Sequence, residues 1–299
     1  MNDEAATQPD AWTVGALLAW TKTHLQGHGV SDARLAAEVL LAHAVDCRRI
    51  ELYTRFETHP DADVVGRFRD LVRRASAHEP VAYLVGEKEF YSLTFRVTAD
   101  VLIPRPETEL LVEYIVDRCA EKSIERPWIL DIGTGSGCIA VALLSQLPGA
   151  RVIASDVSAP ALAIAGENAE RRGVSDRMQC VEANGIELPP EVVPEGGFDI
   201  IASNPPYVSA GDFSDLDANV REYEPEIALT DGGDGCEFFR VISGARGLLR
   251  SDGAVVVEIG MGQAGIVTDL FAESGGWVHK RTLRDRVAGH ERVMVFDAV

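Results

Sequence analysis

Short apolar runs alternate with amphipathic segments from about residue 127 to the C-terminus, and this alternation constrains the fold of the 299-residue chain more than any other feature. The apolar runs predict strands at 128–131, 152–156, 178–181, 198–203, 254–259 and 292–296. Helices are predicted between them, near 138–147, 159–172, 236–250 and 262–273. This order is typical of a mainly parallel sheet with helices on both faces. We therefore predict a Rossmann-like α/β domain.

The N-terminal part of the chain predicts a small helical bundle. Apolar residues recur at helical spacing across residues 12–79, and Gly27 and Gly29 end the first helix. Ser31-Asp32 is placed to cap the second helix. Residues 89–97 alternate and are rich in aromatic residues, which predicts a strand or hairpin. We predict a helical domain over residues 1–88, a β-hairpin linker over 89–106 and the α/β domain over 107–299.

The formal net charge of −19 disfavours general binding to nucleic acid. Contacts of Lys and Arg with phosphate supply most of the affinity in nucleic-acid complexes, and no Lys/Arg run here exceeds two residues. No apolar run approaches the roughly 20 residues that a membrane-spanning helix needs. We expect no direct contact with nucleic acid or membrane. The acidity either serves solubility or attracts a basic partner protein.

The five cysteines indicate a reducing compartment. They are scattered, odd in number and contain no C-x-x-C pair, so neither a disulfide framework nor a zinc site is predicted. The acidic start, Met-Asn-Asp-Glu, lacks the basic and apolar regions of a signal peptide. We expect a cytoplasmic protein that uses no metal.

The segment Asp131–Gly137 (D-x-G-x-G-x-G) follows the first predicted strand of the α/β domain and opens a helix. Glycines let the backbone adopt positive φ and approach a ligand closely. A dinucleotide fingerprint would require Gly or Ala at position 138, where this chain has Cys. The loop instead resembles that of S-adenosylmethionine-dependent methyltransferases. The candidate cofactor-binding residues in it are Gly133, Thr134, Gly135, Ser136 and Gly137.

Two later strand ends carry polar residues that suit a nucleoside. Asp156 ends the second strand, where a carboxylate can accept hydrogen bonds from both ribose hydroxyls. The alternative for Asp156 is a helix cap, although Ser158 could cap that helix instead. Asn184 follows the third strand, where methyltransferases often place a residue that touches adenine. We predict that Asp156 and Asn184 bind the cofactor.

Asn204-Pro205-Pro206-Tyr207 ends the fourth predicted strand. Two prolines fix φ and remove two N–H donors, so the turn is stiff and rich in acceptors. The side-chain oxygen of Asn204 and the carbonyl of Pro205 can each accept an N–H from a planar, conjugated NH2 group, and Tyr207 offers a face for stacking. We predict that all four residues, Pro206 included, bind substrate, that Asn204 also contacts the cofactor, and that Asn204, Pro205 and Tyr207 are catalytic.

Because ligands of open α/β sheets gather at the carboxyl ends of the strands, the glycine loop and the Asn204–Tyr207 turn are expected to share one crevice. Arg105, Glu107 and Glu109 are further candidates for polar ligands near it, or they form only a helix start with a local ion pair. The long, acidic loop 209–235 is expected to cover the substrate.

Six blocks together resemble the release factor glutamine methyltransferase family across nearly the whole chain. They are Gly86–Ser92, Leu102–Glu109, Leu130–Cys138, Ser203–Val208, Glu224–Leu229 and Gly289–Val293. The resemblance implies a class I S-adenosylmethionine-dependent methyltransferase domain behind a small helical domain that binds release factors. It implies methyl transfer from S-adenosyl-L-methionine to the side-chain amide nitrogen (N5) of the glutamine in the Gly-Gly-Gln loop of class 1 peptide chain release factors, which tunes translation termination.

The expected chemistry depends on positioning more than on a base. Hydrogen bonds from the substrate amide to Asn204 and Pro205 would polarise its nitrogen and hold it in line with the methyl group. The N-protonated amide that forms is acidic and loses its proton readily, so no general base is required. Three alternatives stay open: methylation of the N6 amine of adenine in DNA or RNA, methylation of a ribosomal-protein glutamine, and a non-catalytic binder that keeps the fold.

Overall fold

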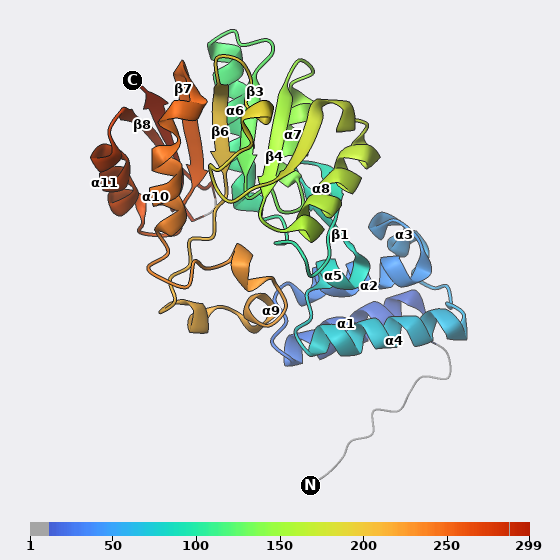
Figure 1. The fold of residues 1–299 in the computed structure, drawn as a ribbon. Helices are drawn as coiled ribbons and strands as arrows, with labels where there is room; N and C mark the ends of the chain where they lie inside the picture. The colour runs from blue at the N-terminus through green and yellow to red at the C-terminus, as the bar shows by residue number, and fades with distance from the viewer. Residues whose placement is uncertain (1–11, 287) are drawn as a thin grey trace. The chain divides into compact units, whose positions relative to one another are not determined.

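Figure 1 shows the computed structural model, which describes residues 12–286 and 288–299. Contacts divide the chain into a smaller unit that ends at Gly86 and a larger unit, Glu87–Val299. In the described part of the chain, no helix is long and apolar enough to span a membrane. The predicted functional division at residues 88 and 106 stays a prediction.

The smaller unit is built from helices along its described residues. They are α1 (Val14–Gly27), α2 (Ala33–Val45), α3 (Arg49–Thr54), α4 (Ala62–Ser76) and α5 (Val81–Val85). Their apolar faces enclose one core that includes Leu25, Leu40 and Phe68. Helices α1 and α2 were predicted individually, and α4 lies within the predicted helical region 12–79. Helices α3 and α5 are too short to show a helical period in sequence.

The predicted cap of α2 is wrong in its chemistry. Asp32 occupies the N-cap position, but it has φ of 48° and its side chain makes no capping hydrogen bond. A side-chain cap normally requires an extended backbone at this position. Thr13 meets that requirement before α1, where its hydroxyl accepts a hydrogen bond from the Ala16 N–H at 3.1 Å.

The larger unit is built on a seven-stranded sheet of order β5-β4-β3-β6-β7-β9-β8. Its strands are β3 (Trp128–Ile132), β4 (Arg151–Asp156), β5 (Met178–Glu182), β6 (Phe198–Ser203), β7 (Leu249–Glu258), β8 (Trp277–Arg284) and β9 (Glu291–Ala298). Strands β5, β4, β3, β6 and β7 pair in parallel, and β9 runs antiparallel to both of its neighbours. The strand order reverses beside β3, which places a ligand crevice between β3 and β6.

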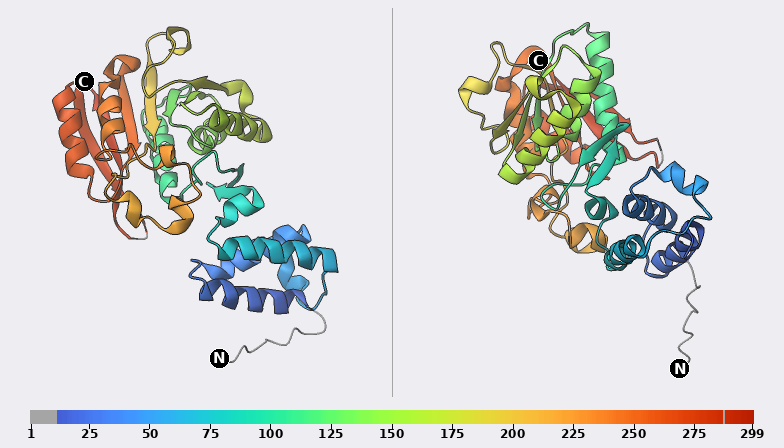
Figure 2. Two further views of the ribbon diagram at one scale, coloured as in Figure 1. Left: turned by 60° about the horizontal axis from the view of Figure 1, so that its bottom comes forward. Right: turned by 90° about the vertical axis from the view of Figure 1, so that its right-hand side faces the viewer.

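Helices cover both faces of this sheet (Figures 1 and 2). Helices α6 (Glu109–Glu121), α7 (Cys138–Gln146) and α8 (Ala159–Arg172) lie on one face, and α10 (Glu237–Ser243) and α11 (Ala264–Ser274) lie on the other. Alternate residues of β6 serve the two layers: Ile200 and Ala202 pack on the α7 side, and Ile201 packs on the α10 side. The predicted Rossmann-like α/β class is confirmed.

The segment that precedes the sheet is a hairpin of β1 (Glu87–Phe90) and β2 (Leu93–Arg96), as the alternating pattern predicted. It packs on α8, where the Asn168 side chain accepts a hydrogen bond from the Arg96 N–H at 2.7 Å and donates one to the Arg96 carbonyl at 3.0 Å. The same Asn168 amide donates to the Ser136 carbonyl at 2.8 Å. The hairpin is thereby tied to the glycine loop.

The prediction for the larger unit is corrected in two places, a missed strand and a changed boundary between a helix and a strand. Strand β8 was missed, because most of its side chains are exposed and it shows no apolar alternation. The helix predicted near 236–250 ends at Ser243, and a 3-10 turn over 244–248 leads into β7 five residues before the predicted strand start.

Candidate active site

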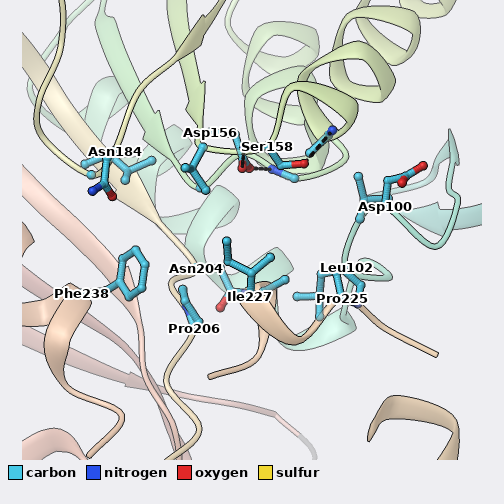
Figure 3. Close-up of a pocket in the computed structure, with 18 of the residues that line it drawn as sticks. Asp100, Leu102, Asp156, Ser158, Asn184, Asn204, Pro206, Pro225, Ile227 and Phe238 are labelled. Carbon is cyan, nitrogen blue, oxygen red and sulfur yellow. Dashed lines mark hydrogen bonds between the residues drawn. The ribbon is translucent and has the colours of Figure 1, made fainter. Parts of the chain in front are cut away.

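A pocket lies at the carboxyl ends of the central strands, and Figure 3 shows it in close-up. Asp156, Ser158 and Asn184 lie along one side, and Asn204 and Pro206 lie across from them. The predicted meeting of the glycine loop with the Asn204–Tyr207 turn is therefore confirmed. Segments far away in sequence complete the lining, namely Asp100–Leu102, Pro225, Ile227, Ala228 and Phe238.

The glycine loop presents its main chain to the pocket. Gly133 and Gly135 line the pocket with φ of 69° and 53°, and a Cβ atom built on either would find no atom within 4 Å. Both positions thus combine a left-handed backbone with open space. Gly137 differs, because a Cβ atom there would stand 3.0 Å from that of Ala165. Glycine at this position allows α8 to pack closely.

The side chains of Thr134 and Ser136 are buried and do not line the pocket. Thr134 donates a hydrogen bond of 2.7 Å to the carboxylate of Asp131, which is fully buried beneath the loop. Burial raises the pKa of Asp131 to about 7. Thr134 therefore supports the loop from its buried side, and the predicted contact of Thr134 and Ser136 with the cofactor stays a prediction.

Asp156 ties the end of β4 to the glycine loop. One carboxylate oxygen accepts a hydrogen bond from the Gly135 N–H at 2.9 Å, and the other accepts one from the Ser158 N–H at 3.0 Å. The capping bond to α8 comes from the Ser158 hydroxyl, which accepts from the Ala161 N–H. The alternative role of Asp156 as the cap is therefore wrong. Asn184 is exposed and lines the pocket beyond the end of β5.

The Asn204–Tyr207 turn divides its residues between the pocket and the interior. Asn204 and Pro206 line the pocket, whereas Pro205 and Tyr207 do not. The Tyr207 carbonyl accepts a hydrogen bond of 3.0 Å from Gln263, and a Cβ on Gly235 would stand 2.4 Å from that carbonyl oxygen. Stacking of Tyr207 on a substrate stays a prediction.

A buried relay of hydrogen bonds lies behind Asn204. Its side-chain amide donates to the Thr108 hydroxyl at 3.2 Å, and that hydroxyl donates to the Glu258 carboxylate at 2.6 Å. The Tyr207 hydroxyl lies 3.4 Å from the other oxygen of Glu258. Burial raises the pKa of Glu258 to about 7, and the same burial, with Glu258 nearby, raises the pKa of Tyr207.

The loop 209–235 is anchored by one buried acidic residue. Glu224 is 5% exposed; it accepts a hydrogen bond from the Ile103 N–H at 3.1 Å and pairs with Arg105 at 2.6 Å. Arg105 thus holds the loop and does not line the pocket. Glu109 likewise turns away and accepts a hydrogen bond from the Tyr91 N–H at 2.7 Å. Neither residue lines the pocket. The alternative of a local ion pair is wrong as well, because the partner of Arg105 lies 119 residues away and Glu109 accepts from a backbone N–H.

Sequence reasoning missed three side chains that organise the site: Thr108, Glu224 and Glu258. A signal for Glu258 existed, because it is an acidic residue that directly follows the apolar, fully buried run 254–257 at the end of β7. A carboxylate at a buried position needs hydrogen-bonding partners. Its partners, however, lie 51 and 150 positions away in sequence.

Known proteins resemble this chain along most of its length. Residues 16–86 match the PrmC N-terminal domain model, and residues 106–222 match the methyltransferase small domain model. The release factor glutamine methyltransferase of Rhodopirellula baltica is 43% identical over 289 residues, which cover 95% of each chain. The chain belongs to the release factor glutamine methyltransferase family. A second relative of this name, from Geobacter sulfurreducens, is 40% identical over 90% of this chain and 91% of its own.

Solved structures agree with the fold of this family member. The hMettl16 catalytic domain, in complex with a MAT2A 3′UTR hairpin, superposes with a TM-score of 0.53 at 18% identity and covers 74% of this chain and 79% of that one. At this identity the likeness shows the methyltransferase fold alone.

Proposed function

We propose that this protein transfers a methyl group from S-adenosyl-L-methionine to N5 of the glutamine in the Gly-Gly-Gln loop of class 1 peptide chain release factors, in the cytoplasm, and so tunes translation termination. One observation carries the proposal: the open glycine loop and the amide of Asn204 face each other across one pocket. The names of the relatives, at 43% and 40% identity, support the substrate.

The glycine-loop side fits S-adenosylmethionine. The open space at Gly133 and Gly135 admits a ligand against the main chain. Asp156 uses one lone pair of each oxygen on backbone N–H groups, so acceptor sites remain for ribose hydroxyls. Asn184 is exposed at the position proposed for adenine. When bound, S-adenosylmethionine supplies the methyl group, whose bond to sulfur breaks as the bond to nitrogen forms.

The opposite side orients the substrate amide. Its nitrogen is a weak nucleophile, because the lone pair is shared with the adjacent carbonyl. Pro205 itself does not line the pocket, but it lies between two residues that do, Asn204 and Pro206. We propose that the Asn204 side-chain oxygen and the Pro205 carbonyl accept the two N–H groups of the substrate amide and thereby polarise and align its nitrogen. The two prolines keep these acceptors fixed, since Pro205 and Pro206 are buried and have restricted φ. Prealigned acceptors need no reorganisation when charge develops.

The proton balance needs no strong base. One amide proton leaves after the carbon–nitrogen bond forms, because the N-protonated amide is acidic. Glu258 is the nearest buried carboxylate to Asn204 along the relay, but it does not line the pocket and is 1% exposed. We therefore assign the departing proton to solvent.

The remaining parts serve the protein substrate. The helical unit matches the PrmC N-terminal domain model over residues 16–86, which supports a role in release-factor binding. Pro225, Ile227 and Ala228 of the loop 209–235 line the pocket and are proposed to contact the glutamine side chain. A net charge of −19 opposes a phosphate-rich substrate, so we propose that nucleic acid is not methylated.

Methyl transfer from labelled S-adenosylmethionine to a purified release factor tests the proposal, with mass mapping of the modified residue. The control is the same factor with Ala in place of the loop glutamine. Label on the wild-type glutamine alone is expected. Ribosomal protein and nucleic acid are supplied as substrates in parallel reactions. Label on either of them, together with no label on the release factor, would contradict the proposed substrate.

A further inference from the structure

The relay behind Asn204 joins three segments that are distant in sequence. Thr108 lies in the turn that precedes α6, Asn204 follows β6, and Glu258 ends β7. Thr108 is 2% exposed and Glu258 is 1% exposed, so water does not compete for their hydrogen bonds. The Asn204 amide donates to Thr108 at 3.2 Å, and Thr108 donates to Glu258 at 2.6 Å.

The chemistry of these groups gives the relay a direction. An ionised carboxylate only accepts hydrogen bonds, so Glu258 requires the single proton of the Thr108 hydroxyl. The hydroxyl oxygen can then only accept, and the group of Asn204 that can donate to it is the NH2. The side-chain oxygen of Asn204 is consequently directed away from Thr108.

The opposite direction would disable the turn. If Thr108 donated to the oxygen of Asn204, the amide would rotate by about half a turn and its NH2 would take the place of the oxygen. Two NH2 groups, one from Asn204 and one from the substrate, would then face each other without an acceptor between them. Orientation of this one amide decides whether the turn can accept the substrate.

We propose that Thr108 and Glu258 are positioning residues, which hold the Asn204 side chain with its oxygen toward the substrate amide. This rests on the proposed function, in which Asn204 accepts an N–H of glutamine. Tyr207 supports Glu258 from the other side at 3.4 Å. Residues of the Leu102–Glu109 block and of the Asn204–Tyr207 turn, Thr108 and Tyr207, thus both contact Glu258 and help to fix the Asn204 side chain.

The test replaces Thr108 by Val, which has nearly the same shape but no hydroxyl, and by Ser, which keeps the hydroxyl. Thr268→Val is a matched control, because among the described residues that hydroxyl donates to the Ala264 carbonyl within its own helix, α11, far in sequence from the relay. In methyl transfer to the release factor, T108V is expected to lose about 10- to 100-fold in kcat, with an unchanged Kd for S-adenosylmethionine. T108S and T268V are expected to retain most of the wild-type kcat.

A second readout does not depend on methyl transfer. The side-chain NH2 signals of Asn204 in 15N-labelled protein, assigned by their loss in Asn204→Ala, report its hydrogen bond directly. Slow exchange of these protons with solvent is expected in wild type, T108S and T268V, and fast exchange in T108V. Glu258→Gln, in which the side chain can also donate, is expected to speed the exchange and lower kcat while Thr108 remains.

Three results would overturn the proposal. The first is slow exchange of the Asn204 NH2 protons in both T108V and Glu258→Gln. The second is fast exchange in these variants with a wild-type kcat, and the third is a loss of kcat in them while exchange stays slow. If T108V does not fold, Glu258→Gln alone decides between these outcomes. If wild type does not methylate the release factor, the proposed function fails, and the exchange measurement still decides whether the relay orients Asn204.

Discussion

The two sides of the pocket are built in different ways. On the glycine-loop side, the main chain of consecutive residues forms the surface, and the Asp156 carboxylate fixes it through the N–H groups of Gly135 and Ser158. On the Asn204 side, one half-buried amide depends on buried side chains from two other segments, Thr108 and Glu258. The first side is local in sequence and the second is not.

We expect this difference to separate cofactor binding from catalysis. The glycine loop offers open space and acceptors that exist before any ligand arrives, so changes there should alter affinity for S-adenosylmethionine. The Asn204 turn offers an acceptor whose value depends on its direction, so changes there should alter kcat. Variants on the glycine-loop side should therefore change mainly the Kd for S-adenosylmethionine, and variants on the Asn204 side should change mainly kcat.

The largest effect is expected for Asn204→Ala. This change removes one of the two acceptors proposed for the substrate amide, and kcat should fall by about 10²- to 10³-fold, the usual cost of one aligned catalytic hydrogen bond. The Kd for S-adenosylmethionine, measured by titration calorimetry, should rise far less than kcat falls, because Asn204 is predicted to make one cofactor contact and the glycine loop and Asp156 are predicted to supply the others. Wild-type kcat in a variant that binds the cofactor normally would show that Asn204 does not position the substrate.

A smaller effect, on the Kd for S-adenosylmethionine and not on kcat, is expected for Asp156→Asn. The neutral amide has one acceptor atom in place of two, so it cannot hold both backbone N–H groups and the ribose. Binding of S-adenosylmethionine should weaken by about 10- to 100-fold, as for loss of a hydrogen bond to a charged group. With saturating cofactor, kcat should return close to that of the wild type. A kcat that stays low under saturation would contradict the division between the two sides.

The fold could be predicted where burial leaves a local pattern. Central parallel strands such as β6, in which all six residues are buried, appear in sequence as continuous apolar runs. The edge strand β8 is largely exposed, so no apolar pattern marks it. Short helices such as α3, of six residues, also escape prediction, because fewer than two turns cannot show the repeat of apolar residues that marks a helix.

The site follows the same rule. The glycine loop and Asp156 were predicted as part of the pocket from the order of residues at strand ends. The partners of Asn204 could not be predicted from spacing, because the hydrogen bonds join positions 96 and 150 residues apart. The same holds for the ion pair of Arg105 with Glu224, which are 119 residues apart. Motifs in this chain marked both sides of the pocket, although their residues Thr134, Ser136, Pro205 and Tyr207 do not line it. The side chains that support Asn204 come from distant segments and carry no such mark.

The pH dependence offers a finer comparison of the two sides, because each side holds a buried carboxyl group. Burial raises the pKa of Glu258 to about 7 and that of Asp131 to about 7. The folded protein therefore binds these protons more tightly than the unfolded chain. Their contribution to the free energy of unfolding is full below the ordinary carboxyl pKa and is lost as the pH rises through about 7.

Catalysis should depend on pH in the opposite sense. Protonated Glu258 can donate to Thr108, which then can donate to the oxygen of Asn204, so kcat should fall as the pH drops below about 7. The groups near Glu258 include Thr108, Tyr207, Glu107, Arg292 and Cys138. Glu107 adds to the upward shift of the Glu258 pKa, and Arg292 opposes it.

The measurement is kcat and melting temperature over the range from about pH 5 to 8.5, in wild type and Glu258→Gln. Wild type should lose thermal stability and gain kcat as the pH rises. Glu258→Gln should start from a lower kcat and lose the pH dependence of kcat near 7, while it keeps the part of the stability slope that Asp131 causes. An unchanged kcat profile in Glu258→Gln would assign that titration to another group, because a glutamine has no proton to lose in this range. Protonation of Glu258 would then not explain the pH dependence of kcat, and the proposed link between Glu258 and the orientation of Asn204 would lose that support.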